Sequence, residues 1–298
     1  MTEPWCVLLA SREPPQQRRM TGHPRMAAQL TKSDPLTATL RRAATVSSFD
    51  RIAAVLAAPA EHSHESSLKE LDAHNVFVQP QHRGTAHEVL FALLMLEGRL
   101  SAAATVLFLP VDHVVDDEHV MTNSLATMAD WIAEEPEAVH LLGAVPQGPH
   151  DQLGYIVPWH DSMQTPSGVY EFVERPDVNR ARQLISAGGL WNTFIFGGTV
   201  AALMELFSPK FTAAMADLRE ALQSGSPELE LSRAYHRLTS SDFSQELLAR
   251  RIDSLKVLRL SQCGWWPLKS PTLTSPPVSA SALRSESRGS VREQRMRE

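Results

Sequence analysis

The sequence predicts an α/β fold with a mainly parallel central sheet that is covered by helices. Short apolar runs alternate along the chain with longer amphipathic segments whose apolar residues recur at helical spacing. Such alternation is typical of parallel strands connected by helices that cross over both faces of a sheet. The clearest apolar run, TVLFL at residues 105–109, has the composition of a strand buried within such a sheet.

Each predicted strand is a short apolar run, and each predicted helix is a longer amphipathic segment. The strands are expected at residues 5–10, 51–58, 76–78, 105–109, 139–145, 155–158, 169–173, 190–196 and 255–260. The helices are expected at residues 36–44, 85–96, 118–134 and 178–187, and residues 199–251 are expected to be largely helical with breaks near Pro209 and Pro227. The alanines of residues 51–58 leave a helix open there, and residues 11–34 are expected to form a loop.

Length and composition indicate one large domain. The chain has 298 residues, of which 43% are hydrophobic, and this is enough for a sizeable core. We expect residues 1–271 to form this domain. After Pro271 the composition shifts to Ser, Pro, Arg and Glu with few large apolar residues, so residues 272–298 are expected to be a disordered tail.

The charge and the cysteines argue against several classes of protein. A net charge of -6 and a pI of about 6.1 give no support for a general nucleic-acid-binding surface or for binding to an anionic membrane. Cys6 and Cys263 lack the spacing of a zinc site and are expected to be reduced thiols. We find no secretory signal pattern and no apolar run long enough to span a bilayer, so a cytoplasmic protein is expected.

An acidic residue follows the clearest predicted strand. Asp112 lies three residues after Leu109, and ligands of open α/β sheets bind beyond the carboxyl ends of the strands. A carboxylate at this point is well placed to hold a divalent metal over a phosphate. The alternative is that Asp112 caps the turn or helix that follows.

The segment QPQHRGTA, residues 79–86, combines a glycine with the start of a predicted helix. Gly84 would let backbone N–H groups approach a ligand, and a helix N-terminus favours anions. The same residues fit an ordinary helix start, with Thr85 as the cap and Glu88 completing a capping box.

Two further positions carry polar groups that could bind a ligand. Arg175, which follows Glu174 near the end of a predicted strand, could bind a phosphate through two hydrogen bonds, although a surface ion pair of these two residues is the alternative. Asn192 offers both a donor and an acceptor, which suits sugar hydroxyls, and a turn residue beside a buried Trp191 is its alternative.

Taken in order, five segments make the sequence resemble mannose-1-phosphate guanylyltransferases. They are QPQHRGTA, LPVDH, LLGAVP followed by LGYIVP, EFVERP and GGLWNTFIF. The resemblance extends over about residues 7–271. It implies a Rossmann-like nucleotidyltransferase fold and the transfer of GMP from GTP to mannose 1-phosphate, giving GDP-mannose and pyrophosphate.

The resemblance also implies a role for each matching residue. Asp112 would bind Mg²⁺, and GTP and mannose 1-phosphate would be the small-molecule partners, with a homodimer left open. Arg175 stands where the family usually has a lysine that meets the sugar phosphate, and Arg25 stands where a catalytic lysine is expected. The implied nucleotide-binding residues are Gln79, Gly84 and Thr85, the implied sugar-phosphate-binding residues are Gly154, Glu174, Arg175 and Asn192, and the implied catalytic residues are Asp112, Arg25 and Arg175.

Two elements of the family pattern are altered in this sequence. The family's first strand is followed by a glycine-rich loop whose backbone amides cradle the triphosphate, but residues 11–15 contain no glycine, and Pro14 and Pro15 have no backbone N–H to donate. Pro267 stands where the family carries the Asp that is the second metal ligand.

These changes leave three functions open. The chain is either a working guanylyltransferase, or a catalytically impaired member that binds a sugar nucleotide or regulates a partner, or a nucleotidyltransferase for another sugar 1-phosphate or base. The Trp191-Asn192 pair and the LGYIVP run favour the mannose type.

Overall fold

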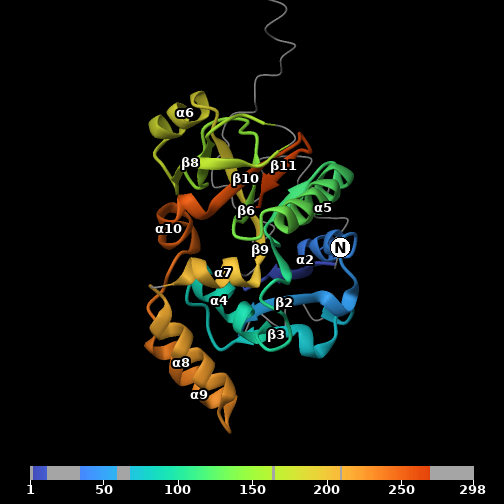
Figure 1. Cartoon of the computed structure of the whole chain (residues 1–298), viewed down its shortest axis with the longest axis vertical. Coiled ribbons are helices and arrows are strands. Elements are labelled where there is room, and N and C mark those ends of the chain that lie inside the picture. The colour runs from blue at the N-terminus through green and yellow to red at the C-terminus, as the bar shows by residue number, and fades with distance from the viewer. Residues whose placement is uncertain (1–2, 12–33, 59–67, 163–164, 209, 269–298) are drawn as a thin grey trace, which may run out of the picture.

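A nine-stranded sheet lies at the centre of the computed structural model, which describes residues 3–11, 34–58, 68–162, 165–208 and 210–268 (Figure 1). The strand order is β3-β2-β1-β4-β9-β6-β10-β8-β7. The strands are β1 (Trp5–Leu9), β2 (Ile52–Ala57), β3 (Val76–Gln79), β4 (Thr105–Pro110), β6 (Val139–Ala144), β7 (Tyr155–Pro158), β8 (Ser167–Val173), β9 (Leu190–Thr199) and β10 (Leu255–Leu260). A separate pair is formed by β5 (His113–Val115) and β11 (Trp265–Pro267).

The sheet is mixed, so the prediction of a mainly parallel sheet is not confirmed. Strands β3, β2, β1 and β4 pair in parallel, as do β6 and β10. In contrast, β9 runs antiparallel to both β4 and β6, and β8 runs antiparallel to β10 and β7. The short connection between β7 and β8 accounts for one antiparallel pair, because consecutive strands joined by a short connection can pair only in this way. The others arise because β9, which follows α6, enters the sheet between β4 and β6 in the opposite direction, and β8 pairs with β10 in the same sense.

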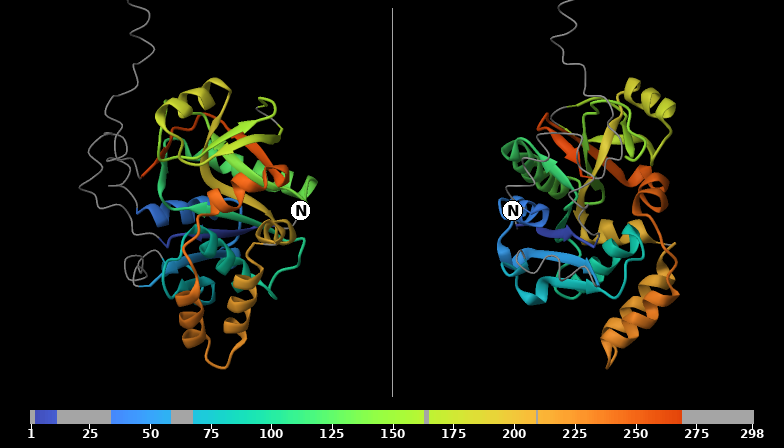
Figure 2. Two further views of the ribbon diagram at one scale, coloured as in Figure 1. Left: turned by 90° about the vertical axis from the view of Figure 1, so that its left-hand side faces the viewer. Right: turned by 180° about the vertical axis from the view of Figure 1, so that it is seen from behind.

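Helices cover both faces of the sheet (Figure 2). Alternate residues of β1 show this clearly, because Val7 and Leu9 belong to one buried cluster while Cys6 and Leu8 belong to another. The first cluster includes residues of α4 (Thr85–Leu96), α7 (Val200–Phe207), α8 (Thr212–Gln223), α9 (Pro227–Arg237) and α10 (Phe243–Glu246). The second includes residues of α2 (Pro35–Ala43), α5 (Glu118–Glu134) and α6 (Val178–Ser186).

Most predicted elements are confirmed within the described residues. Residues 52–57 form a strand rather than the alternative helix, and α4 and α5 have the predicted bounds. The short strands β5 and β11 were not predicted, since three-residue runs carry no periodic signal. The predicted tail, Pro209 and residues 12–33 of the predicted loop lie outside the described residues. In the part of the chain that is described, no helix has the length and apolar character needed to cross a membrane.

The helices α8 and α9 form a hairpin that projects from one end of the molecule in Figures 1 and 2. The hairpin returns to the core through Leu218 and Tyr235, which are fully buried. After α9 the chain crosses the first turn of α4 and enters α10. This return path brings residues 241–244 to the edge of the sheet at which β3 ends and α4 begins.

The central strand β9 should be a major determinant of stability. Phe196 is fully buried and stacks on Phe108 at 4.9 Å and on Phe243 at 4.7 Å between ring centroids. We expect Phe196→Ala to lower the free energy of unfolding by about 3–5 kcal/mol in urea denaturation, because it removes a buried ring and leaves a cavity. The control Leu229→Ala, at a side chain that is 52% exposed on α9, should change it by less than about 0.5 kcal/mol. A loss below about 1 kcal/mol for Phe196→Ala would contradict this close packing.

Candidate active site

Asp112 lies just beyond the carboxyl end of β4, in the turn that leads to β5. The pairing of β5 with β11 sets Pro267 opposite His113, and the Leu268 N–H donates to the carbonyl oxygen of Asp112 at 2.7 Å. The position that carries the second metal-binding Asp in the resembling family therefore lies alongside Asp112, and its proline offers no side-chain oxygen. Asp117, rather than Asp112, caps α5 by accepting from the Val120 N–H at 3.2 Å.

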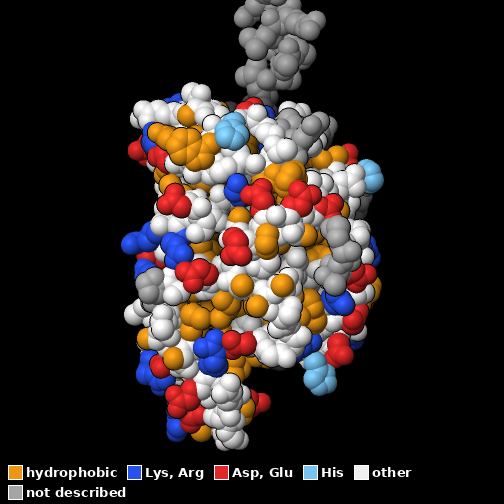
Figure 3. Space-filling view, in the orientation of Figure 1, with side chains coloured by type: hydrophobic (Ala, Val, Ile, Leu, Met, Phe, Trp, Pro, Cys, Tyr) orange, Lys and Arg blue, Asp and Glu red, His pale blue; other side chains and the backbone are white. Residues whose placement is uncertain are grey.

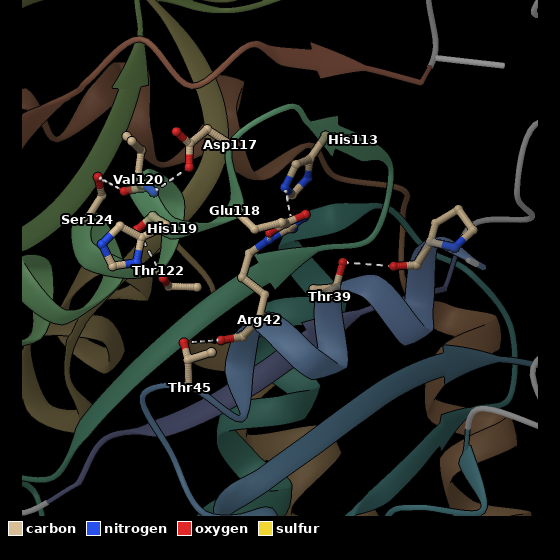
Figure 4. Close-up of polar contacts among 11 residues, drawn as sticks. Thr39, Arg42, Thr45, His113, Asp117, Glu118, His119, Val120, Thr122 and Ser124 are labelled. Carbon is tan, nitrogen blue, oxygen red and sulfur yellow. Dashed lines mark hydrogen bonds and ion pairs between the residues drawn. The ribbon is translucent and has the colours of Figure 1, made fainter. Parts of the chain in front are cut away.

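An ion pair that is buried on its arginine side fixes the chain next to Asp112 (Figure 4). The side chain of Arg42 on α2 is 1% exposed, and its Nε and Nη2 each donate to the carboxylate of Glu118 at 2.8 Å. Its Nη1 donates to His113 Nε2 at 2.8 Å. Burial and then the charge of Arg42 lower the pKa of His113 well below its ordinary value. Because arginine can only donate, Nε2 accepts and the ring proton lies on Nδ1.

A divalent metal at this point would have one protein carboxylate. The described residues contain no group of three or more His, Cys, Asp or Glu side chains able to hold a metal ion. Mg²⁺ is commonly bound by one or two carboxylates together with substrate phosphates. Asp112 alone would supply one such carboxylate. Within the described residues, this donor set fits a divalent metal that is also bound by a substrate phosphate, and it does not fit a metal held by protein side chains only.

Gly154, Glu174 and Asn192 meet at the same edge of the sheet. The Asn192 N–H donates to the carbonyl oxygen of Gly154 at 2.8 Å, and a Cβ atom on Gly154 would lie 2.4 Å from Glu174 Oε2. The absence of a side chain at Gly154 thus leaves the space that the Glu174 carboxylate occupies. Glu174 and Arg175 do form an ion pair, the alternative that the sequence left open, at 3.4 Å between Oε1 and Nε. The pair is only partly at the surface, because the side chain of Glu174 is 10% exposed.

Asn192 lies within β9, so it is not a turn residue. Its Oδ1 accepts from the Phe194 N–H at 3.1 Å, and its Nδ2 donates to Ser244 Oγ at 3.4 Å. Arg175 has a backbone φ of 49° and a side chain that is 44% exposed. Its Nη2 donates to Asp242 Oδ2 at 3.5 Å. Asp242 is thus paired with Arg175, next to the set formed by Gly154, Glu174 and Asn192.

The expected nucleotide-binding residue Gln79 is fully buried and bonded at both ends of its amide. Its Nε2 donates to Ser11 Oγ at 2.7 Å, and its Oε1 accepts from the Tyr235 hydroxyl at 3.0 Å. The Ser11 N–H in turn donates to Glu88 Oε1 at 3.2 Å. Burial and then the charge of Glu88 raise the pKa of Tyr235 well above its ordinary value, so its hydroxyl stays a donor.

Residues 241–243 lie across the first turn of α4. The Ala86 N–H donates to the carbonyl oxygen of Ser241 at 3.1 Å, and Thr85 Oγ1 accepts from the Phe243 N–H at 2.8 Å. Gly84, with a φ of 87°, is the N-cap, and a Cβ there would lie 2.2 Å from the same carbonyl oxygen. The predicted capping box is therefore wrong, because Thr85 is already inside the helix and Glu88 binds Ser11 instead.

The predicted residues thus fall into three neighbouring sets at one edge of the sheet. Residues 241–244 link two of them, since they contact Gly84 and Thr85 on one side and Arg175 and Asn192 on the other. Asp112 belongs to the third set, at the end of the neighbouring strand β4. Arg25 lies outside the described residues.

Sequence reasoning missed the residues that hold these sets in place. Arg42 and His113 are 71 positions apart, and Gln79 and Tyr235 are 156 apart, so no local pattern connects them. Only an alignment showing paired substitutions would have provided a signal. Acidic and basic side chains are interspersed on the face that Figure 3 shows.

Comparisons with curated proteins agree with the sequence resemblance. The alginate biosynthesis protein AlgA of Pseudomonas aeruginosa is 34% identical over 186 residues, which are 58% of this chain and 37% of AlgA. The mannose-1-phosphate guanylyltransferase of Klebsiella pneumoniae is 32% identical over 135 residues, covering 43% of this chain and 28% of that protein. The chain spans between 26% and 37% of the length of the curated relatives it matches.

Solved structures share the fold. The mannose-1-phosphate geranyltransferase of Thermus thermophilus superposes with a TM-score of 0.74 at 21% identity, covering 89% of this chain and 76% of that chain. The mannose-6-phosphate isomerase of Helicobacter pylori superposes with a TM-score of 0.66 at 15% identity, covering 89% of this chain and 100% of that chain. At these identities the likeness concerns the fold alone.

The family is shown by a family model that matches most of the chain. The nucleotidyl transferase family model matches residues 20–234, well over half of the chain. The matched range includes Gln79, Asp112, Glu174 and Asn192, and on this match the chain belongs to the nucleotidyl transferase family.

Proposed function

We propose that the protein is a mannose-1-phosphate guanylyltransferase, which transfers GMP from GTP to mannose 1-phosphate. Membership of the nucleotidyl transferase family and the similarity to proteins named mannose-1-phosphate guanylyltransferase support this substrate class. The observation that carries the proposal is the convergence of Gly154, Glu174 and Asn192 beside the partly exposed Arg175. This arrangement combines hydroxyl-binding groups with a guanidinium for the phosphate, as a sugar phosphate requires.

In the proposed reaction an oxygen of the mannose 1-phosphate attacks the α-phosphorus of GTP. The bond between the α-phosphorus and the bridging oxygen of pyrophosphate breaks, and pyrophosphate leaves with the electron pair. Arg175 would hold the attacking phosphate, while Glu174 and Asn192 would fix the sugar through its hydroxyls. Mg²⁺, which Asp112 would hold, supplies charge neutralisation for the phosphates when bound.

A second candidate is a family member that binds a sugar nucleotide without useful turnover. Two observations favour it. Pro267 provides no carboxylate beside Asp112, and both ends of the Gln79 amide are bonded within the chain. Phosphoryl-type transfer depends on positioning and charge neutralisation, so losses on the triphosphate side would impair turnover more than sugar binding.

The primary test is release of pyrophosphate and formation of GDP-mannose from GTP, mannose 1-phosphate and Mg²⁺. We expect Asp112→Asn to lower turnover by about 10²-fold, the scale of losing one charge-stabilising group. The control Asp130→Asn changes an exposed residue of α5 and should leave turnover unchanged. Activity with another sugar 1-phosphate or nucleoside triphosphate, and none with this pair, would contradict the proposed substrates. If no pair of nucleoside triphosphate and sugar 1-phosphate releases pyrophosphate, the proposed enzymatic activity is contradicted and the second candidate is favoured.

Pro267→Asp should restore a metal ligand. We expect it to raise Mg²⁺-dependent turnover by about tenfold or more, because removing support from a metal site commonly costs about 10–100-fold. The matched control Pro267→Asn gives the backbone the same freedom without the charge, and it should not raise turnover. Equal turnover for the two variants at every Mg²⁺ concentration would mean that a missing carboxylate does not limit the reaction.

Binding of the two nucleotides should differ. GDP-mannose has no γ-phosphate, so it should depend less than GTP on the altered loop residues 11–15. We expect isothermal titration calorimetry to give weaker binding for GTP than for GDP-mannose. Tighter binding of GTP would contradict a weakened triphosphate side.

A further inference from the structure

Arg175 is held loosely between two carboxylates. Its Nε lies 3.4 Å from Glu174 Oε1, and its Nη2 lies 3.5 Å from Asp242 Oδ2. Both distances are at the upper limit for a hydrogen bond. The Arg42–Glu118 pair of the same molecule, by contrast, has two contacts of 2.8 Å and is buried on its arginine side. Arg175 can therefore exchange its partner at a lower cost than Arg42 can.

The backbone at Arg175 is also in an unusual conformation. Its φ of 49° lies in the left-handed region, which disfavours residues with a Cβ, and Pro176 restricts the residue before it further. Strain of this kind persists only where the surroundings enforce it, and it occurs most often at ligand-binding positions. Here the strained backbone directs the guanidinium toward α10, where Asp242 lies.

Asp242 is fixed, whereas the side chain of Arg175 is 44% exposed. One carboxylate oxygen of Asp242 accepts from the Gln245 N–H at 3.1 Å, and the other faces Arg175. The residues on either side are anchored to α4, through Ser241 to Ala86 and through Phe243 to Thr85. In this pair the carboxylate is the immobile partner and the long arginine side chain is the adaptable one.

We propose that Asp242 is a built-in competitor for the phosphate of the sugar substrate. This inference rests on the proposed function, in which Arg175 meets the sugar phosphate. In the ligand-free protein, Asp242 supplies the negative charge that the phosphate supplies in the complex. An incoming phosphate must replace Asp242 as the partner of Arg175 and also meets its repulsion. Asp242 is thus a positioning residue that keeps sugar-phosphate affinity low without touching the reacting atoms.

The competitor role predicts a dependence on ligand charge. Removing the charge of Asp242 should strengthen binding most for mannose 1-phosphate, which carries two negative charges near neutral pH. It should strengthen binding less for the methyl ester of that phosphate, which carries one, and leave neutral mannose unaffected. A merely structural role in capping α10 predicts no such order.

The test is titration calorimetry of mannose 1-phosphate with the full chain and with Asp242→Asn. Asparagine is equal in size and caps helices as well as aspartate, so α10 should be retained. We expect the dissociation constant to fall by about 2–5-fold, the range for a partly exposed ion pair. Asp217→Asn, which breaks the exposed Arg237–Asp217 pair of the α8–α9 hairpin, should leave it unchanged.

A second variant separates competition from other effects of the substitution. In an Arg175→Met background, Asp242→Asn should tighten binding less than it does in the native chain, because the competition is for Arg175. Equal melting temperatures of the native chain and Asp242→Asn would show that the fold is kept. If Asp242→Asn melts at a lower temperature, the same titration is carried out with Asp242→Ser, because serine also caps helices.

The outcomes distinguish this inference from the proposed function. If the native chain binds mannose 1-phosphate and Asp242→Asn leaves this affinity unchanged or lowers it, the inference alone is overturned. Equal tightening with and without Arg175 also overturns it. No binding of mannose 1-phosphate by the native chain or by any variant overturns the proposed function, and the inference with it.

Discussion

The arrangement of the candidate site depends on the backbone contact between residues 241–243 and the first turn of α4. A helix start leaves several N–H groups without intrahelical partners, and here the Ser241 carbonyl accepts one of them from Ala86. Gly84 makes the contact possible, because a Cβ would lie 2.2 Å from that carbonyl oxygen. Since Asp242 and Ser244 follow directly, this one contact also sets where the partners of Arg175 and Asn192 lie.

The two sides of the site differ in how they are built. On the side proposed to bind the sugar phosphate, Arg175 is partly exposed, and Gly154, Glu174 and Asn192 meet from three different strands or strand ends. On the side proposed to bind the nucleotide, Gln79 is buried among hydrogen bonds to Ser11 and Tyr235, so binding a base there would require exchanging internal partners. The family generally uses a divalent metal, and in this chain the candidate metal position has one carboxylate, that of Asp112, with Pro267 beside it.

The sequence was informative where structure is local. The periodic apolar residues of α4 and α5 predicted both helices with their observed bounds, and the apolar run at residues 105–109 located Asp112 at a strand end. It failed where partners are distant along the chain. The antiparallel insertion of β9 between β4 and β6, the contact of Arg42 with His113, and the seating of Ser241 on α4 all depend on tertiary packing. Glu88 illustrates the limit well, because its spacing from Thr85 matched a capping box while its actual partner is Ser11.

The seating of Ser241 on Gly84 affects how a motif in this family should be interpreted. Gly84 belongs to the run from which nucleotide binding is inferred, but in this chain its missing side chain makes room for another part of the same protein. A descendant that had lost all affinity for nucleotides would still be selected to keep this glycine, because any larger residue would displace the backbone of Ser241. Retention of the glycine in a divergent sequence is therefore evidence of an intact fold. Evidence of catalysis has to come from residues that are not needed for packing.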